Sequence, residues 1–146
     1  MPAGTSFLIE KGMLGKTLKN VRIDGKDYVR IDVVNQYLHA VHPLAYTRRI
    51  DLKIDGEVIP NDQFFFVVRN QWIRGDHVKN IVDIYWYLCE PAQIYVCRDG
   101  GIAGGKHVVE CAFTASYLEE TSIIDLEDFW QQRTQTVVEE MTVEEE

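Results

Sequence analysis

Two Asp-Gly pairs, each between alternating stretches, most restrict what this chain can fold into. Asp24-Gly25 separates residues 16–23 from the alternating run 28–33, and Asp55-Gly56 separates the strictly alternating run 49–54 from residues 57–59. An Asp-Gly pair favours the positive φ angles of a two-residue hairpin turn, and apolar residues at every second position place one face of a strand inward. The sequence therefore predicts two β-hairpins.

Further strands follow from the balance of apolar residues. The chain has 16 valines and 13 isoleucines against 9 leucines and 7 alanines, which favours pleated sheet over helix. We expect strands over residues 63–68, 83–88, 92–97 and 107–117, with a wide glycine-rich turn over residues 99–105. About eight evenly spaced strands, mostly joined by hairpins, predict an all-β fold, an antiparallel sandwich of two sheets that is jelly-roll-like.

The net charge of −8 is concentrated after residue 117. Residues 1–117 carry 14 basic and 13 acidic side chains, whereas residues 118–146 carry ten acidic side chains against Arg133 alone. We expect a β-sandwich domain over residues 1–117 and an acidic C-terminal extension over residues 118–146. The extension is expected to be solvated or to dock on a partner, with a short helical or irregular segment over residues 125–133.

The same composition argues against two classes of partner, nucleic acids and membranes, and predicts a location. An acidic balance is unfavourable for binding nucleic acid. The apolar runs are only a few residues long, and the N-terminal residues lack the pattern of a signal peptide, so we expect no membrane span. The expected location is cytoplasmic.

Cysteine and histidine spacing gives no convincing catalytic site. The three cysteines, at positions 89, 97 and 111, form no Cys-x-x-Cys pair and are expected to be buried, reduced thiols. A nucleophilic Cys111 would need His107 nearby, and the even offset places both on one strand face. The glycine-rich segment lacks the Gly-x4-Gly-Lys-Ser/Thr order, so we expect a turn and not an anion site. His39 and His42 suggest a cupin-like metalloenzyme as an alternative, but without a third nearby ligand we expect no metal site.

An interaction surface is the better reading of the remaining residues. Trp86 lies between apolar residues and is expected in the core, whereas Trp72 and the long connection over residues 34–47 are candidates for contact with another protein. Trp, Tyr and Arg are enriched in such interfaces. The candidate interface residues are Tyr37, His39, His42, Tyr46, Arg48, Trp72 and Arg74.

The order of motifs resembles a known family. Lys53-Ile54-Asp55-Gly56-Glu57-Val58-Ile59-Pro60 precedes a Phe-rich strand, an aromatic strand that ends at Glu90-Pro91-Ala92, and Gly100-Gly101-Ile102-Ala103-Gly104-Gly105-Lys106-His107. This order resembles the small (β) subunit of bacterial C-glycoside deglycosidases, from about residue 20 to about residue 115. Tyr37 and Pro43-Leu44 also fit the resemblance.

The resemblance implies an accessory β subunit of an enzyme made of two different chains. In that family a larger TIM-barrel α subunit carries a divalent metal, typically manganese, and the acid–base residues. The complex cleaves the C–C bond of 3-oxo-C-glucosides of flavonoid type by elimination. For this chain we therefore expect a β-sandwich that docks on the α subunit and has neither a catalytic residue nor a cofactor. The alternative is a stand-alone carbohydrate-binding β-sandwich.

Overall fold

Strands make up most of the structure, a computed structural model that describes residues 14–34, 41–87, 89–116 and 132–144. Short 3-10 segments lie between some of them: η1 (Leu44–Tyr46), η2 (Asn61–Gln63) and η3 (Gly75–Asn80). The all-β prediction is confirmed. The strands are β1 (Leu14–Ile23), β2 (Lys26–Val34), β3 (Val41–Pro43), β4 (Thr47–Ile54), β5 (Glu57–Ile59), β6 (Phe64–Val68), β7 (Gln71–Arg74), β8 (Tyr85–Tyr87), β9 (Pro91–Cys97), β10 (Lys106–Ser116) and β11 (Gln132–Glu144).

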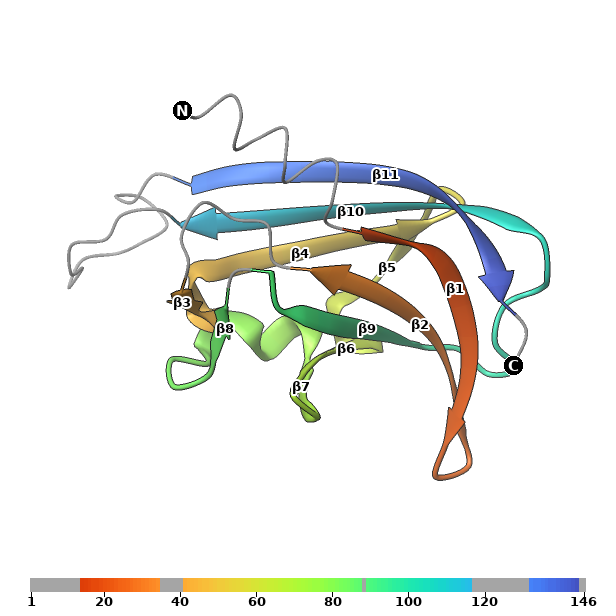
Figure 1. Ribbon diagram of the computed structural model, residues 1–146, viewed down its shortest axis with the longest axis horizontal. Helices are drawn as coiled ribbons and strands as arrows, with labels where there is room; N and C mark the ends of the chain where they lie inside the picture. The colour runs from red at the N-terminus through yellow and green to blue at the C-terminus, as the bar shows by residue number, and fades with distance from the viewer. Residues whose placement is uncertain (1–13, 35–40, 88, 117–131, 145–146) are drawn as a thin grey trace.

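Hydrogen bonds join nine of these strands into a single sheet in the order β5-β4-β10-β11-β1-β2-β9-β6-β7. The sheet curls so that β4 and β10 face β9 and β6 across the core (Figure 1). Within the described residues the pairs are antiparallel except for β1 and β11, which run parallel. β3 and β8 form a separate two-stranded sheet. The expected division into two antiparallel sheets is therefore not confirmed, because one curled sheet provides both sides of the core.

The hairpins follow the turn chemistry of the sequence. Asp24 and Gly25 have φ angles of 52° and 81°, and Asp55 and Gly56 have 54° and 82°. Both predicted hairpins, β1–β2 and β4–β5, are confirmed. A third hairpin, β6–β7, turns at Arg69-Asn70 with φ angles of 49° and 65°, although no glycine marks it.

The acidic C-terminal region contains a strand of the sheet. β11 pairs with β10 over eleven residues and with β1 over three, and the Met141 side chain is buried in the core. The prediction of a solvated or docked extension is wrong for residues 132–144, because they form an interior strand that pairs with β10 on one side and β1 on the other. The expected helix over residues 125–133 lies outside the described residues except for Gln132 and Arg133, which are in β11.

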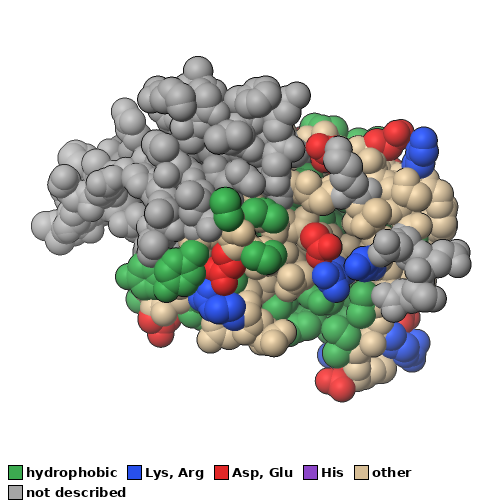
Figure 2. Space-filling view, viewed as in Figure 1, with side chains coloured by type: hydrophobic (Ala, Val, Ile, Leu, Met, Phe, Trp, Pro, Cys, Tyr) green, Lys and Arg blue, Asp and Glu red, His purple; other side chains and the backbone are tan. Residues whose placement is uncertain are grey.

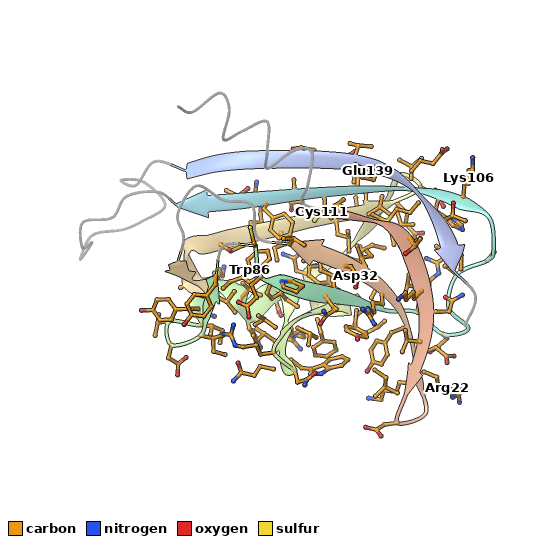
Figure 3. The ribbon with its side chains drawn as sticks, in the orientation of Figure 1. Arg22, Asp32, Trp86, Lys106, Cys111 and Glu139 are labelled. Carbon is orange, nitrogen blue, oxygen red and sulfur yellow. The ribbon has the colours of Figure 1, made fainter. Side chains whose placement is uncertain are left out.

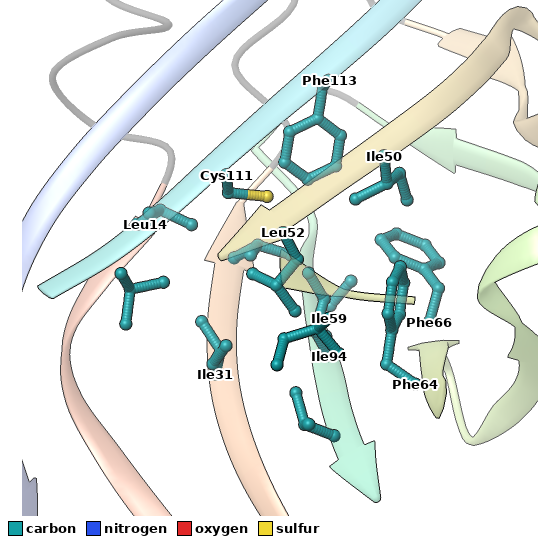
Figure 4. Close-up of a cluster of buried hydrophobic side chains, with 14 of the residues drawn as sticks. Leu14, Ile31, Ile50, Leu52, Ile59, Phe64, Phe66, Ile94, Cys111 and Phe113 are labelled. Carbon is teal, nitrogen blue, oxygen red and sulfur yellow. The ribbon is translucent and has the colours of Figure 1, made fainter. Parts of the chain in front are cut away.

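The core fills the inside of the curl. Phe64, Phe66, Phe113 and Ile50 are at most 1% exposed and meet there from β6, β10 and β4 (Figure 4). Trp86 is fully buried, as predicted, and its indole donates a hydrogen bond to the Glu90 carbonyl at 2.8 Å. Its label in Figure 3 lies well inside the fold, whereas Arg22 and Lys106 lie at the far ends of their strands. Burial of such large apolar side chains is the main source of stability.

Candidate partner-docking surface

An aromatic cluster covers part of the outer face of the sheet, away from the core. It consists of Tyr28 on β2, Phe65 on β6, Trp72 on β7 and Tyr95 on β9. The ring centroid of Trp72 lies 4.6 Å from Tyr95, 5.5 Å from Phe65 and 5.6 Å from Tyr28. These are the separations at which aromatic rings attract one another. We call this group the outer aromatic cluster.

Strand register brings the outer aromatic cluster together. Phe65 pairs with Tyr95 across β6 and β9, and Val67 pairs with Trp72 across β6 and β7. Because side chains alternate along a strand, these residues point away from the core that their neighbours fill. Tyr28 is 8% exposed and Val67 is 2% exposed, although both lie on the outer face. Trp72 remains 39% exposed and is the most exposed member of the cluster.

Charged groups beside the cluster neutralise one another. Arg74 donates hydrogen bonds to both carboxylate oxygens of Asp76, at 2.7 and 2.9 Å, and Arg30 donates to Asp32 at 2.8 Å. The Arg74 hydrogen bond lowers the pKa of Asp76, and the same contact raises the pKa of Arg74. Acidic and basic side chains are also mixed over the described surface in Figure 2. The result is an apolar, electrically neutral surface of the kind that docks on another protein.

A second exposed aromatic group lies on β8. Tyr85 and Tyr87 are 40% and 48% exposed, and the Arg69 guanidinium lies 5.4 Å from the ring centroid of Tyr87. Arg69 also forms an ion pair with Glu90 and donates a hydrogen bond to the Tyr85 carbonyl at 2.6 Å. These contacts fix the arginine side chain in place, so this group also has the composition of an interface.

The predicted interface residues fall into separate regions. Trp72 and Arg74 lie on β7, next to the outer aromatic cluster. His42 pairs with Trp86 in the β3–β8 sheet, while Tyr46 is in η1 and Arg48 in β4.

Tyr37 and His39 lie outside the described residues. Sequence reasoning missed Tyr28, Phe65 and Tyr95. The signal for Phe65 and Tyr95 is an aromatic residue at a position that alternation assigns to solvent.

The cysteine and histidine predictions have mixed outcomes. Cys111 and His107 lie on one face of β10, but Cys111 is fully buried, and burial raises the pKa of its thiol, which disfavours a nucleophilic thiolate. The prediction of buried thiols is wrong for Cys89 and Cys97, which are exposed. Cys89 follows β8 in a turn with a φ of 65°, and Cys97 points to the outer face at the end of β9.

The described parts of the chain contain no group of three or more His, Cys, Asp or Glu side chains that could hold a metal ion. They also contain no helix with the length and apolar character needed to cross a bilayer. Residues 99–105 form a connection between two strands, and the following residues begin β10 rather than a helix.

Comparison with known proteins gives the family. No curated protein matches the sequence. The sequence model of the C-glycoside deglycosidase beta subunit matches residues 10–117, which is most of the chain and includes the strands from β1 to β10. A beta subunit implies a partner subunit with which it forms the enzyme. The chain belongs to the C-glycoside deglycosidase beta subunit family.

Proposed function

We propose that this chain is a non-catalytic accessory subunit that docks on a larger TIM-barrel α subunit. The family match over residues 10–117 is the observation that carries the proposal. The side chains most suited to chemistry are engaged elsewhere: Cys111 is buried, and both ring nitrogens of His107 are within hydrogen-bond distance of other groups. The acid–base residues therefore belong to the partner in this proposal.

The proposed reaction is cleavage of the C–C glycosidic bond of 3-oxo-C-glucosides that carry a flavonoid-type aglycone. A ketone at C3 of the sugar acidifies the proton on C2. Removal of that proton by a base forms a C1–C2 double bond as the C1–aglycone bond breaks, and the aglycone carbon takes up a proton. A divalent cation, manganese in this proposal, supplies charge stabilisation at the ketone oxygen. The described residues offer no matching ligand set, so we place the cation in the α subunit.

We further propose that Trp72 and Arg74 contribute to the docking surface. Trp72 is held rigid by three ring contacts but keeps 39% of its surface exposed, which lowers the entropic cost of burying it against a partner. The other predicted interface residues, in the connection from Tyr37 to Arg48, remain candidates for the same role. The neutral surroundings avoid repulsion during association.

Co-expression with the α subunit tests the proposal. The purified chain is expected to fold and to release no aglycone from a 3-oxo-C-glucoside, whereas the complex releases it. Aglycone release by the isolated chain would refute the accessory role. Metal that co-purifies with the isolated chain would instead support the cupin-like alternative.

Two matched substitutions locate the docking surface. Trp72→Ala is expected to weaken subunit association by about 30-fold or more, the size of a hot-spot loss. Tyr85→Ala tests the second aromatic group on β8, and Val58→Ala is the control, because Val58 is 63% exposed and lies on β5, at the other end of the sheet from β7. Arg74→Ala leaves the aromatic rings in place and tests the same surface should Trp72→Ala fail to fold. Weakening by Tyr85→Ala alone would place the interface on β8.

The alternative, a stand-alone carbohydrate-binding module, rests on the exposed Trp72 ring beside Tyr95. Aromatic faces of this kind also accept sugar rings. Isothermal titration of the isolated chain with mono- and oligosaccharides distinguishes the two functions. Saturable sugar binding that Trp72→Ala abolishes would favour the module, whereas the accessory proposal expects no heat of binding.

A further inference from the structure

The glycine-rich connection between β9 and β10, residues 98–105, crosses one end of the sheet. Its two strands are not neighbours, because β2, β1 and β11 lie between them. The side chain of Asn20 on β1 accepts a hydrogen bond from the Ile102 amide at 2.8 Å and donates one to the Ile102 carbonyl at 2.9 Å. Asp27 on β2 accepts a hydrogen bond from the Gly100 amide at 2.9 Å. The first half of the crossing is thus fastened to the β1–β2 hairpin.

The second half of the crossing is fastened by His107. The Nδ1 atom of His107 lies 2.6 Å from a carboxylate oxygen of Asp55, in the β4–β5 turn, and Nε2 lies 2.8 Å from the Ala103 carbonyl oxygen. The other carboxylate oxygen of Asp55 accepts a hydrogen bond from the Val108 amide at 2.8 Å. An ionised carboxylate and a carbonyl are acceptors only, so both contacts are hydrogen bonds only when both ring nitrogens carry protons.

The groups around the His107 imidazole both raise and lower its pKa. The hydrogen bond to Asp55 raises the pKa of His107 most, followed by the bond to the Ala103 carbonyl, while partial burial and the charge of Arg98, which follows β9, lower it. The side chain of Arg98 lies 3.9 Å from Glu57 in β5. The His107 contact, followed by the Val108 amide, lowers the pKa of Asp55. Lys106 and Glu140 are 3.9 Å apart and lie on the opposite face of β10 and β11.

We propose that protonation of His107 controls the attachment of residues 103–105. The protonated ring links them to the β4–β5 turn, and the neutral ring releases Ala103. The neutral ring keeps one N–H group, and that proton stays on Nδ1 because the bond to the Asp55 carboxylate is the stronger one. Nε2 then presents a lone pair to the Ala103 carbonyl oxygen, and the two acceptors repel. The stabilisation is complete below about pH 6.5, the ordinary pKa of histidine, and is lost as the pH rises through the raised value.

Amide hydrogen exchange, measured on the full chain, detects the release of Ala103 from His107. The Val143 amide donates a hydrogen bond to the Gly105 carbonyl at 3.1 Å, so it gains exposure when the end of the crossing loosens. We expect its protection factor, corrected for intrinsic exchange, to fall about tenfold or more between about pH 6 and about pH 9. NMR of the His107 ring nitrogens follows the protonation state in the same samples.

Three variants make the test specific. Asp55→Asn supplies an N–H donor to Nδ1, so the neutral ring carries its proton on Nε2 and holds Ala103 at every pH. We therefore expect its Val143 protection to be independent of pH. His107→Gln should show low protection throughout, and His77→Gln, at an exposed histidine, should match the unmodified chain. An unmodified chain whose Val143 protection stays constant while His107 titrates, or an Asp55→Asn variant that keeps the full pH dependence, would overturn the proposal.

Discussion

Alanine substitution at two adjacent glycines of the β9–β10 connection tests whether Asn20 of β1 fixes the conformation of that connection. Gly100 and Gly101 have φ angles of +80° and +71°, so alanine at either position costs about 1–2 kcal/mol from the left-handed backbone alone. A Cβ on Gly100 meets no atom within 4 Å, whereas a Cβ on Gly101 overlaps the Asn20 amide oxygen and lies 2.7 Å from its Cγ. Only Gly101→Ala therefore displaces the Asn20 side chain.

The loss of stability that this displacement causes follows from the hydrogen bonds of Asn20. Asn20 makes two hydrogen bonds to Ile102, each contributing about 0.5–1.5 kcal/mol, and both are lost when its side chain moves. Gly101→Ala should therefore lower the free energy of unfolding by about 1–3 kcal/mol more than Gly100→Ala does. Urea unfolding followed by tryptophan fluorescence measures both variants. Equal losses at the two positions would refute the argument that Asn20 fixes the crossing.

Other predictions concern the core, the thiols and the last strand. Phe113→Ala should cost about 3–5 kcal/mol in urea unfolding because the ring is fully buried, whereas Val58→Ala, 63% exposed, should change stability by about 0.5 kcal/mol or less. A thiol reagent should label two cysteines of the folded chain quickly and reach Cys111 only on unfolding; rapid labelling of all three would contradict its burial. Deletion of residues 132–146 should abolish cooperative unfolding, measured by circular dichroism, because β10 and β1 lose their shared neighbour; an unchanged midpoint would show that β11 contributes nothing.

Local patterns predicted the parts of the fold that depend on near neighbours in sequence. Asp24-Gly25 and Asp55-Gly56 mark their hairpins because the turn conformation is a property of those two residues. Trp86 was placed in the core because apolar residues surround it in the chain. The Arg69-Asn70 hairpin was missed because Asn70 is preceded by an arginine, which is unusual at positive φ, and is not followed by glycine.

Such local patterns could not predict which strands pair when they are distant in sequence. Residues 132–144 contain strand-forming Thr and Val, but their partners in β10 and β1 are not adjacent in sequence, and the glutamates suggested solvent instead. The glycine-rich crossing was recognised as a turn, yet nothing local states that β9 and β10 are separated in the sheet. For the candidate docking surface, residue type alone suggested Trp72, whereas its neighbours Phe65 and Tyr95 required the strand register.

The position of β11 in the sheet also determines when its neighbouring strands can pair during synthesis. The ribosome completes β11 after the other ten strands, yet β11 occupies an interior place between β10 and β1. At about 5–20 residues per second, about 6–24 s separate the completion of β1 from that of β11. The edge of β1 stays unpaired throughout this interval, and the edge of β10 stays unpaired after Ser116 has been added; unpaired edges favour aggregation. Folding of the complete sheet therefore waits until Glu144 has been added, and chaperone binding to the nascent chain should concentrate on β1 and β10.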